Sequence, residues 1–190
     1  GRAATTAPIG ITARQPAETG DVKLRLELSK SRCYVHEPVI LTVIWYLGQC
    51  GFAVRTSNHL LLFDYQEEWD GGKRRDSPAR PSLENGHLVP EQVKDLSVRV
   101  FVSHEHSDHW YPAILSWRST ITDIAYFFGW PAGAEASCHY LTEPRATFSD
   151  GDLAVYTTHV TNEVRETAYL VMVDGLAIYH NGDWIGDFAT

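Results

Sequence analysis

The feature that most constrains this chain is a group of histidine and aspartate residues directly after an apolar run. Residues 98–103 read VRVFVS, a β-branched and aromatic segment that predicts a short buried strand. Residues 104–109 read HEHSDH and supply four metal-ligand side chains within six positions. A polar loop of solvated histidines is the alternative, but four such groups at the end of an apolar strand favour a metal site.

The spacing of these four side chains indicates how they could share metal ions. At the end of an extended strand His104 and His106 project to the same side, because side chains alternate with a period of two. They can therefore bind one ion. Asp108 and His109 follow after the strand has turned, so we expect them to point to a neighbouring position. Imidazole and carboxylate ligands suit zinc, with iron or manganese as alternatives, and one or two ions could bind.

Periodicity along the rest of the chain predicts several strands and few helices. Asp174-Gly175 between two apolar runs is a strong hairpin signal. Strands are expected within residues 22–28, 38–46, 44–64, 98–103, 123–130, 146–156 and 168–179, and helical turns within 90–96 and 111–121. This order predicts an α+β fold with mixed sheets flanked by helices. We expect a linker or disordered arm at 1–21, an N-terminal β extension at 22–42 and the main domain at 43–190.

Composition and net charge argue against some classes of binding partner. The chain has 190 residues, of which 44% are hydrophobic, enough for one sizeable core. Its net charge of −8 argues against a broad phosphate-binding surface, so no nucleic-acid partner is expected. The apolar runs are too short to span a bilayer, so no membrane partner is expected either. Three cysteines without CxxC spacing do not predict a disulfide framework. The compartment stays unknown, with the cytoplasm favoured.

The order of motifs resembles that of the metallo-β-lactamase superfamily. SHEHSDH after a buried strand is similar to its HxHxDH signature. The segment from Ile44 to Tyr65 resembles its opening strands, and the hairpin ending in Gly182-Asp183 resembles its later GD motif. The similarity covers about residues 43–187 and is greatest to an uncharacterised hydrolase branch of the superfamily. It implies an αββα sandwich.

The resemblance also implies roles for individual residues. Asp108 would be catalytic, by orienting the attacking hydroxide or by binding the second ion. Asp64, at the end of a strand, would accept hydrogen bonds from the histidine loop and orient the ligands without binding metal itself. The implied ligands are His104, His106 and His159 for a first zinc ion, Asp108 and His109 for a second, and Asp183 as a bridge between the two. We read the histidines at positions 36, 59, 87 and 139 as ordinary surface residues.

The resemblance ends before the family's last motif. The family continues well past the GD motif and supplies a final histidine ligand to the second zinc ion. No histidine follows His180 in this sequence. The sequence therefore predicts a sandwich that is incomplete at its C-terminal end, and a chain that self-associates or is complemented by a C-terminal segment.

The function implied by the resemblance is zinc-dependent hydrolysis. A hydroxide bound to zinc would attack an ester, a lactone or a related small-molecule substrate. A phosphodiester hydrolase of the ribonuclease Z kind is an alternative, against which the net charge weighs. A non-catalytic metal-binding or interaction module that kept the same fold is another.

Overall fold

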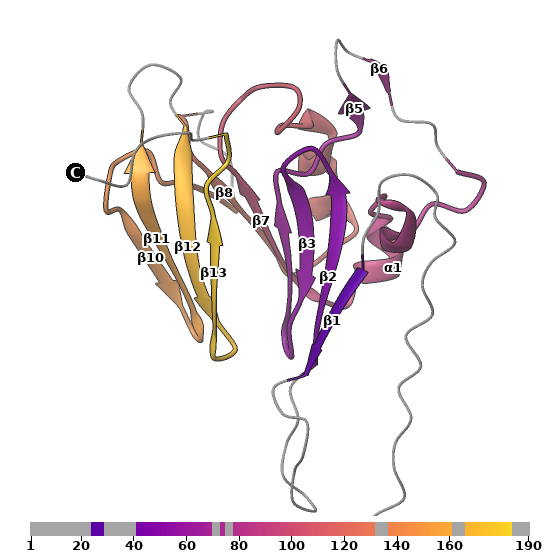
Figure 1. Ribbon diagram of the computed structural model, residues 1–190, viewed down its shortest axis with the longest axis horizontal. Coiled ribbons are helices and arrows are strands. Elements are labelled where there is room, and N and C mark those ends of the chain that lie inside the picture. Colours follow the sequence, from indigo (N-terminus) through magenta and orange to yellow (C-terminus); the bar gives the residue numbers. More distant parts are fainter. Residues whose placement is uncertain are drawn as a thin grey trace, which may run out of the picture.

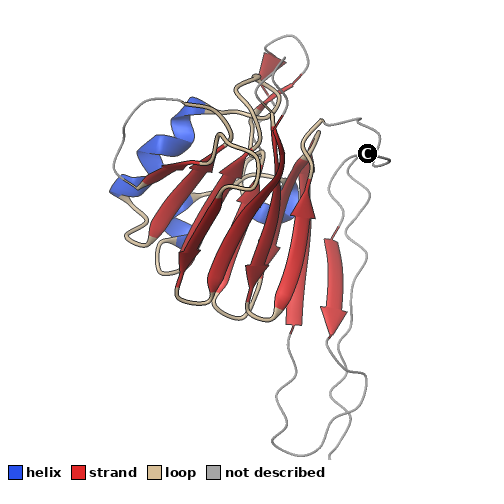
Figure 2. Ribbon diagram, turned by 90° about the vertical axis from the view of Figure 1, so that its left-hand side faces the viewer, coloured by secondary structure: helices blue, strands red, loops and turns tan. Residues whose placement is uncertain are grey.

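The described residues form two β-sheets stacked face to face and a separate two-stranded sheet, with short helices on the outer face of the largest sheet (Figures 1 and 2). The computed structural model describes residues 24–28, 41–69, 73–74, 78–131, 137–160 and 166–183. The larger sheet has the order β1-β2-β3-β4-β7-β8-β9. Its strands are β1 (Leu24–Leu28), β2 (Leu41–Gly48), β3 (Gly51–Arg55), β4 (His59–Phe63), β7 (Ser97–Val102), β8 (Ile124–Phe128) and β9 (Cys138–Tyr140).

The larger sheet is mixed, and its parallel part determines where the functional loops lie. Strands β1 to β4 form antiparallel pairs, whereas β4, β7, β8 and β9 run parallel to one another. The carboxyl ends of β4 and β7 therefore meet at the same edge of the sheet. Asp64 follows β4 there and His104 follows β7.

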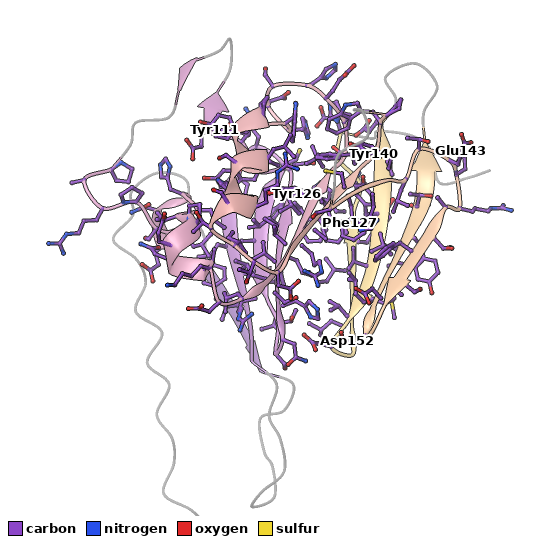
Figure 3. The ribbon with its side chains drawn as sticks, turned by 180° about the vertical axis from the view of Figure 1, so that it is seen from behind. Tyr111, Tyr126, Phe127, Tyr140, Glu143 and Asp152 are labelled. Atoms are coloured by element: carbon purple, nitrogen blue, oxygen red, sulfur yellow. The ribbon has the colours of Figure 1, made fainter. Side chains whose placement is uncertain are left out.

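Alternating side chains of the central strands fill two separate cores. In β7, Val98, Val100 and Val102 face the helices, and Phe101 faces the smaller sheet. Figure 3 labels Tyr126 and Phe127 of β8, consecutive residues whose side chains belong to opposite cores. A strand buried on both faces has no solvent-exposed side, which is why VRVFVS is apolar except for Arg99 and Ser103.

The smaller sheet is an antiparallel meander. Its strands, in order, are β10 (Thr147–Asp150), β11 (Leu153–Val160), β12 (Thr167–Val173) and β13 (Leu176–His180). Asp174 and Gly175 join β12 to β13, with φ of 49° and 76°. Two consecutive positive φ angles are what a two-residue hairpin turn needs. The hairpin predicted from Asp-Gly is confirmed.

Helices are short in the described residues. They comprise the 3₁₀ helices η1 (Leu83–Asn85) and η2 (Pro112–Ser119) and the α-helix α1 (Pro90–Val93). Residues 111–121 were expected to form an amphipathic helix, and the segment buries Ile114 and Trp117 as expected. It is nevertheless a 3₁₀ helix, in which residues three apart lie one above the other, and this spacing matches its two buried side chains.

Two further sequence expectations differ from the structure. His59 and His87 are buried, with exposed fractions of 6% each, rather than ordinary surface residues. Strand β9 and the small β5–β6 pair (Glu68–Trp69 and Lys73–Arg74) were not anticipated. Strand β1 pairs with β2 in the same sheet as the main domain. Residues 1–21 lie outside the described residues, so their assignment as an arm stays a prediction.

The outer face of the smaller sheet carries exposed apolar side chains. Tyr156, Leu170 and Tyr179 lie side by side across β11, β12 and β13. Tyr156 and Met172 are each 40% exposed and Tyr179 is 46% exposed. The described helices lie on the larger sheet, so the layers are helix, sheet and sheet (Figure 2). No helix in the described ranges is long and apolar enough to cross a membrane.

Candidate metal centre

A single carboxylate organises the end of the sheet where β4 and β7 finish. Asp64 is fully buried. Its Oδ1 atom accepts a hydrogen bond from the Ser103 amide at 2.7 Å, and its Oδ2 atom accepts one from the Ser103 hydroxyl at 2.9 Å. The same Oδ2 atom lies 2.8 Å from Nδ1 of His109 and 2.7 Å from Nε2 of His180. Asp64 thus ties the histidine loop to the end of β13.

The charges of this group depend on one another. Burial alone would raise the pKa of Asp64, but the neighbouring imidazoles of His180 and His109 outweigh it and hold the pKa well below its usual range. Burial alone would lower the pKa of His109, but the hydrogen bond to Asp64 and the nearby carboxylates raise that pKa to about 9. Asp64 is therefore a carboxylate, and it fixes the orientation of the His109 ring.

Ser103 determines which nitrogen of His104 is available to a ligand. The Ser103 hydroxyl has one proton, which it donates to Asp64, so it must accept from Nδ1 of His104, 3.0 Å away. This leaves the lone pair of His104 on Nε2, which lies 3.0 Å from Nδ1 of His106. Burial, followed by the charge of His109, lowers the pKa of His104 to about 4. His104 is therefore neutral at pH 7, as a metal ligand must be.

The three imidazoles of the motif form one cluster. The His104 ring centroid lies 4.5 Å from that of His106 and 4.1 Å from that of His109. His104 and His109 are buried, whereas His106 is exposed and Asp108 is half-buried. The structure brings His104, His106 and His109 together, whereas His109 was expected with Asp108 at a neighbouring position.

The second nitrogen of His109 points to the carboxylates. Its Nε2 atom is buried and makes no hydrogen bond with any described residue. It lies 3.2 Å from Oδ1 of Asp183 and 3.6 Å from Oδ2 of Asp108. The structure thus brings the GD aspartate, 74 residues downstream by sequence number, to the histidine loop.

Asp183 is held in place by Glu166, the residue before β12. Its amide donates a hydrogen bond to Oε1 of Glu166, and burial raises the pKa of that glutamate above its usual value. Gly182 has φ of 56°, and a Cβ atom there would contact Glu166 and lie 2.8 Å from Oγ of Ser103. Glycine at 182 therefore allows the loop after β13 to pack against the end of β7.

The backbone of His159 lies at the same end of the smaller sheet. His159 is the penultimate residue of β11 and pairs with Ala168 of β12, after a register shift at Thr157. The neighbouring amide of Thr167 donates to the carbonyl of Ser103 at 3.1 Å. The His159 side chain is outside the part of the chain that the structure describes, so its ligand role stays a prediction.

Sequence reasoning missed four residues at this centre. Ser103 and Glu166 hold its ligands, and His180 was considered but not selected. Cys50, in the turn between β2 and β3, has its Sγ atom 3.4 Å from Oδ1 of Asp183. Burial and the adjacent Asp183 carboxylate raise the pKa of Cys50 to about 12. The sequence shows only that Cys50 lies between two glycines, Gly48 and Gly51. This pattern indicates a turn but does not indicate which distant residues contact it.

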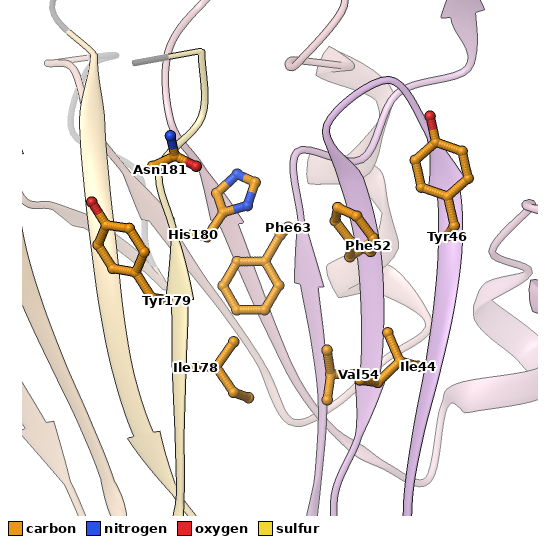
Figure 4. A pocket seen from close by; sticks show the side chains of 9 residues that line it. All are labelled: Ile44, Tyr46, Phe52, Val54, Phe63, Ile178, Tyr179, His180 and Asn181. Atoms are coloured by element: carbon orange, nitrogen blue, oxygen red, sulfur yellow. The ribbon is translucent and has the colours of Figure 1, made fainter. Parts of the chain in front are cut away.

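An apolar cavity of about 700 Å³ lies between the larger sheet and β13. Aromatic side chains dominate its lining, and His180 and Asn181 lie at its β13 wall (Figure 4). Since His180 contacts Asp64 and Asn181 leads to Asp183, the cavity adjoins the centre. Its lining residues are Ile44, Tyr46, Phe52, Val54, Phe63, Ile178, Tyr179, His180 and Asn181.

No protein-family model and no curated protein sequence matches the chain. Among solved structures, a Parabacteroides distasonis protein assigned as a metal-dependent hydrolase is similar, with 16% identity over 85% of this chain and 67% of that one and a TM-score of 0.49. The diiron β-hydroxylase CmlA from Streptomyces venezuelae is 13% identical over 75% of this chain and 29% of its own, with a TM-score of 0.49.

The metallo-β-lactamase fold protein YhfI from Bacillus subtilis is also similar. It is 14% identical over 73% of this chain and 56% of its own, with a TM-score of 0.46. The chain thus covers between 29% and 67% of the length of these structures. The described part of the chain has an α+β fold of two stacked sheets, with the HxHxDH loop at the end of β7.

Proposed function

We propose that the chain is a metal-dependent hydrolase whose metal ions bind at the ends of β7 and β13. The observation that carries this proposal is the Nε2 atom of His109. It is buried, makes no hydrogen bond with a described residue, and faces two carboxylates. A buried polar nitrogen normally has a hydrogen-bond partner, and a metal cation between this nitrogen and the two carboxylates would bind all three groups.

The donor set fits a divalent metal ion. His104 and His106 would hold one ion, with His159 as the predicted third ligand. His109, Asp108 and Asp183 would hold another, with Asp183 between the two groups. Histidine and carboxylate ligands favour zinc, with iron or manganese as alternatives. Asp64 would orient His109 through Nδ1, in the way that carboxylates commonly support histidine ligands.

A bound divalent ion supplies Lewis acidity and lowers the pKa of a coordinated water molecule. The residues of this chain provide the remaining parts of the reaction. Asp108 is half-buried at the edge of the centre, where it could accept a proton from an attacking water molecule. The Ser103–Asp64–His180 hydrogen bonds keep the imidazole cluster rigid.

We infer an ester, a lactone or a related small molecule as substrate. The adjoining cavity is lined by aromatic and aliphatic side chains and would accept an apolar substituent. The net charge of −8 disfavours a long phosphodiester substrate, which leaves small phosphodiesters as the second candidate.

The experiment is metal analysis combined with a substrate panel. The purified chain would be analysed for transition metals and assayed on aryl esters, lactones and a bis-aryl phosphodiester. The assays would be repeated after chelation and after return of zinc, iron or manganese. We expect at least one ion per chain and hydrolysis that depends on it, with loss of most of the metal and of the hydrolysis in His104→Ala. Metal binding without turnover of any substrate would favour a non-catalytic module, and absence of metal binding would overturn the proposal.

A further inference from the structure

The turn between β2 and β3 carries a cysteine to the metal centre. Gly48 and Gln49 have φ of 101° and 48°, and Gly48 pairs with Gly51 across the turn. A Cβ atom at Gly51 would lie 2.9 Å from the carbonyl oxygens of Asp64 and Gly48. Glycine at this position lets the turn pack directly on the backbone of Asp64. Cys50 is thereby fixed beside the residue that orients the histidines.

The atoms of three side chains gather at one point. Cys50 Sγ lies 3.4 Å from Asp183 Oδ1, and the same oxygen lies 3.2 Å from His109 Nε2. The potential ligand atoms of Cys50, His109 and Asp183 all lie within 4.8 Å of one another. Neighbouring ligands of a tetrahedral zinc ion are about 3.3–3.8 Å apart, given bonds of roughly 2.0–2.3 Å. The two short separations are already close to that range.

Negatively charged side chains surround this group of atoms. Cys50 lies near the negative charges of Asp183, Asp64 and Asp108. The buried Nε2 atom of His109, 1% exposed as a side chain, points into the same space without a hydrogen bond from any described residue. A sulfur ligand, an imidazole and a carboxylate directed at one point form a recognised type of zinc or iron coordination set.

We propose that Cys50 is a ligand of the second metal ion, together with His109 and Asp183. This inference rests on the proposed metal centre and adds a ligand to it. Cys50 would coordinate as the thiolate, so its thiol proton passes to solvent when the ion binds. A sulfur ligand also shifts the preference of this position toward zinc, iron or cobalt and away from manganese.

Cobalt substitution tests the inference without reference to activity. The chain would be loaded with two equivalents of Co²⁺ and its near-ultraviolet absorption recorded, because a thiolate bound to Co²⁺ gives a charge-transfer band there. The Cys33→Ser/Cys138→Ser double variant keeps Cys50 as its only cysteine. The matched variant Cys50→Ser keeps the other two. We expect the band in the wild type and in the double variant, and its loss in Cys50→Ser.

The cobalt stoichiometry separates this inference from the proposed function. Cys50→Ser should still bind the first ion, whose visible absorption arises from its histidine ligands, and should bind the second ion at least roughly tenfold more weakly. X-ray absorption of the zinc form should show a sulfur neighbour at about 2.3 Å in the double variant. Two tightly bound ions without a thiolate band would overturn the role of Cys50 and leave the metal centre standing. A wild type that binds no cobalt would overturn both.

Discussion

Asp64 and His109 form a buried hydrogen bond of 2.8 Å between Oδ2 and Nδ1, which turns the other nitrogen of His109 toward Asp183. The carboxylate comes from the end of β4 and the imidazole from the loop after β7. Because these strands are parallel neighbours in the sheet, their ends are adjacent although 45 residues separate them. The sheet therefore positions the nitrogen that the metal ion would use.

Replacement of Asp64 tests this orienting role. Asp64→Asn keeps the size of the side chain but removes its negative charge and places an amide donor where three donors now converge. We expect metal affinity to fall by roughly 10–100-fold, as is typical for loss of a group that orients a ligand. Isothermal titration calorimetry with Zn²⁺ measures this affinity. Asp95→Asn, at an exposed position, is the control and should bind like the wild type. Equal affinity in both variants would contradict the role.

Removal of metal should destabilise the fold. Ions that bind only the folded chain stabilise it by mass action, by about 2.7 kcal/mol at a free concentration of one hundred times Kd. We expect chelation to lower the melting temperature and added zinc to restore it. His104→Ala keeps the ligands of the second ion and should therefore show a smaller change in melting temperature on chelation than the wild type. If neither chelator nor added zinc changes the melting temperature of the wild type, the proposed metal centre is contradicted.

Asp174 should make stability depend on pH at the opposite end of the sheets. It accepts hydrogen bonds from the Thr56 hydroxyl at 2.6 Å and the Asn58 amide at 2.9 Å. Burial alone would raise the pKa of Asp174, but these hydrogen bonds outweigh it and hold the pKa well below its usual range. Its stabilisation is therefore complete above the unfolded pKa of about 3.9 and is lost as the pH falls further.

The measurement for Asp174 is urea unfolding at pH 7 and near pH 2. Asp174→Ala should lower the free energy of unfolding by about 1.5–3 kcal/mol at pH 7, because hydrogen bonds to a charged acceptor are lost. The difference from the wild type should shrink at the lower pH. Asp152→Ala, at an exposed carboxylate, should change stability by less than about 0.5 kcal/mol. A difference that is the same at both pH values would refute the charge-based account.

Substitution of Gly129 by any larger residue should destabilise the fold. It follows β8, and a Cβ atom there would collide with the Ser103 carbonyl and lie 2.6 Å from Cβ of Thr167. Thr167 and Ser103 join the two sheets, so neither can move freely. We expect Gly129→Ala to cost about 1–3 kcal/mol and to weaken metal binding as well. Gly151→Ala meets nothing within 4 Å and should affect stability through its φ of 58° alone, without changing metal affinity.

The apolar outer face of the smaller sheet should promote self-association, as the sequence led us to expect. Tyr156, Met172 and Tyr179 expose 40–46% of their surface there. Contiguous exposed apolar surface is typical of interaction sites. We expect light scattering to show concentration-dependent oligomers of the wild type and mostly monomer for Tyr156→Ser/Met172→Ser. Phe52→Ser, which removes an exposed ring from the larger sheet instead, should associate like the wild type. Oligomers that persist in the double variant would place the contact elsewhere.

The sequence by itself determined the local parts of this protein. Apolar runs of period two predicted the strands, Asp174-Gly175 predicted the β12–β13 turn, and HEHSDH predicted a ligand cluster at the end of β7. The mixed α+β arrangement followed from the order of these elements. Such features depend on side-chain alternation and turn geometry over a few residues, which a sequence displays directly.

Only the tertiary structure decided which distant residues complete the centre. His180 reaches Asp64 because β13 ends at the same edge as β4, and Cys50 reaches Asp183 because the β2–β3 turn packs on the Asp64 backbone. Neither residue carries a local signal, since one ends an ordinary strand and the other lies in a tight turn. Their proximity arises from sheet stacking and register between segments more than 100 residues apart, and no local pattern encodes such contacts.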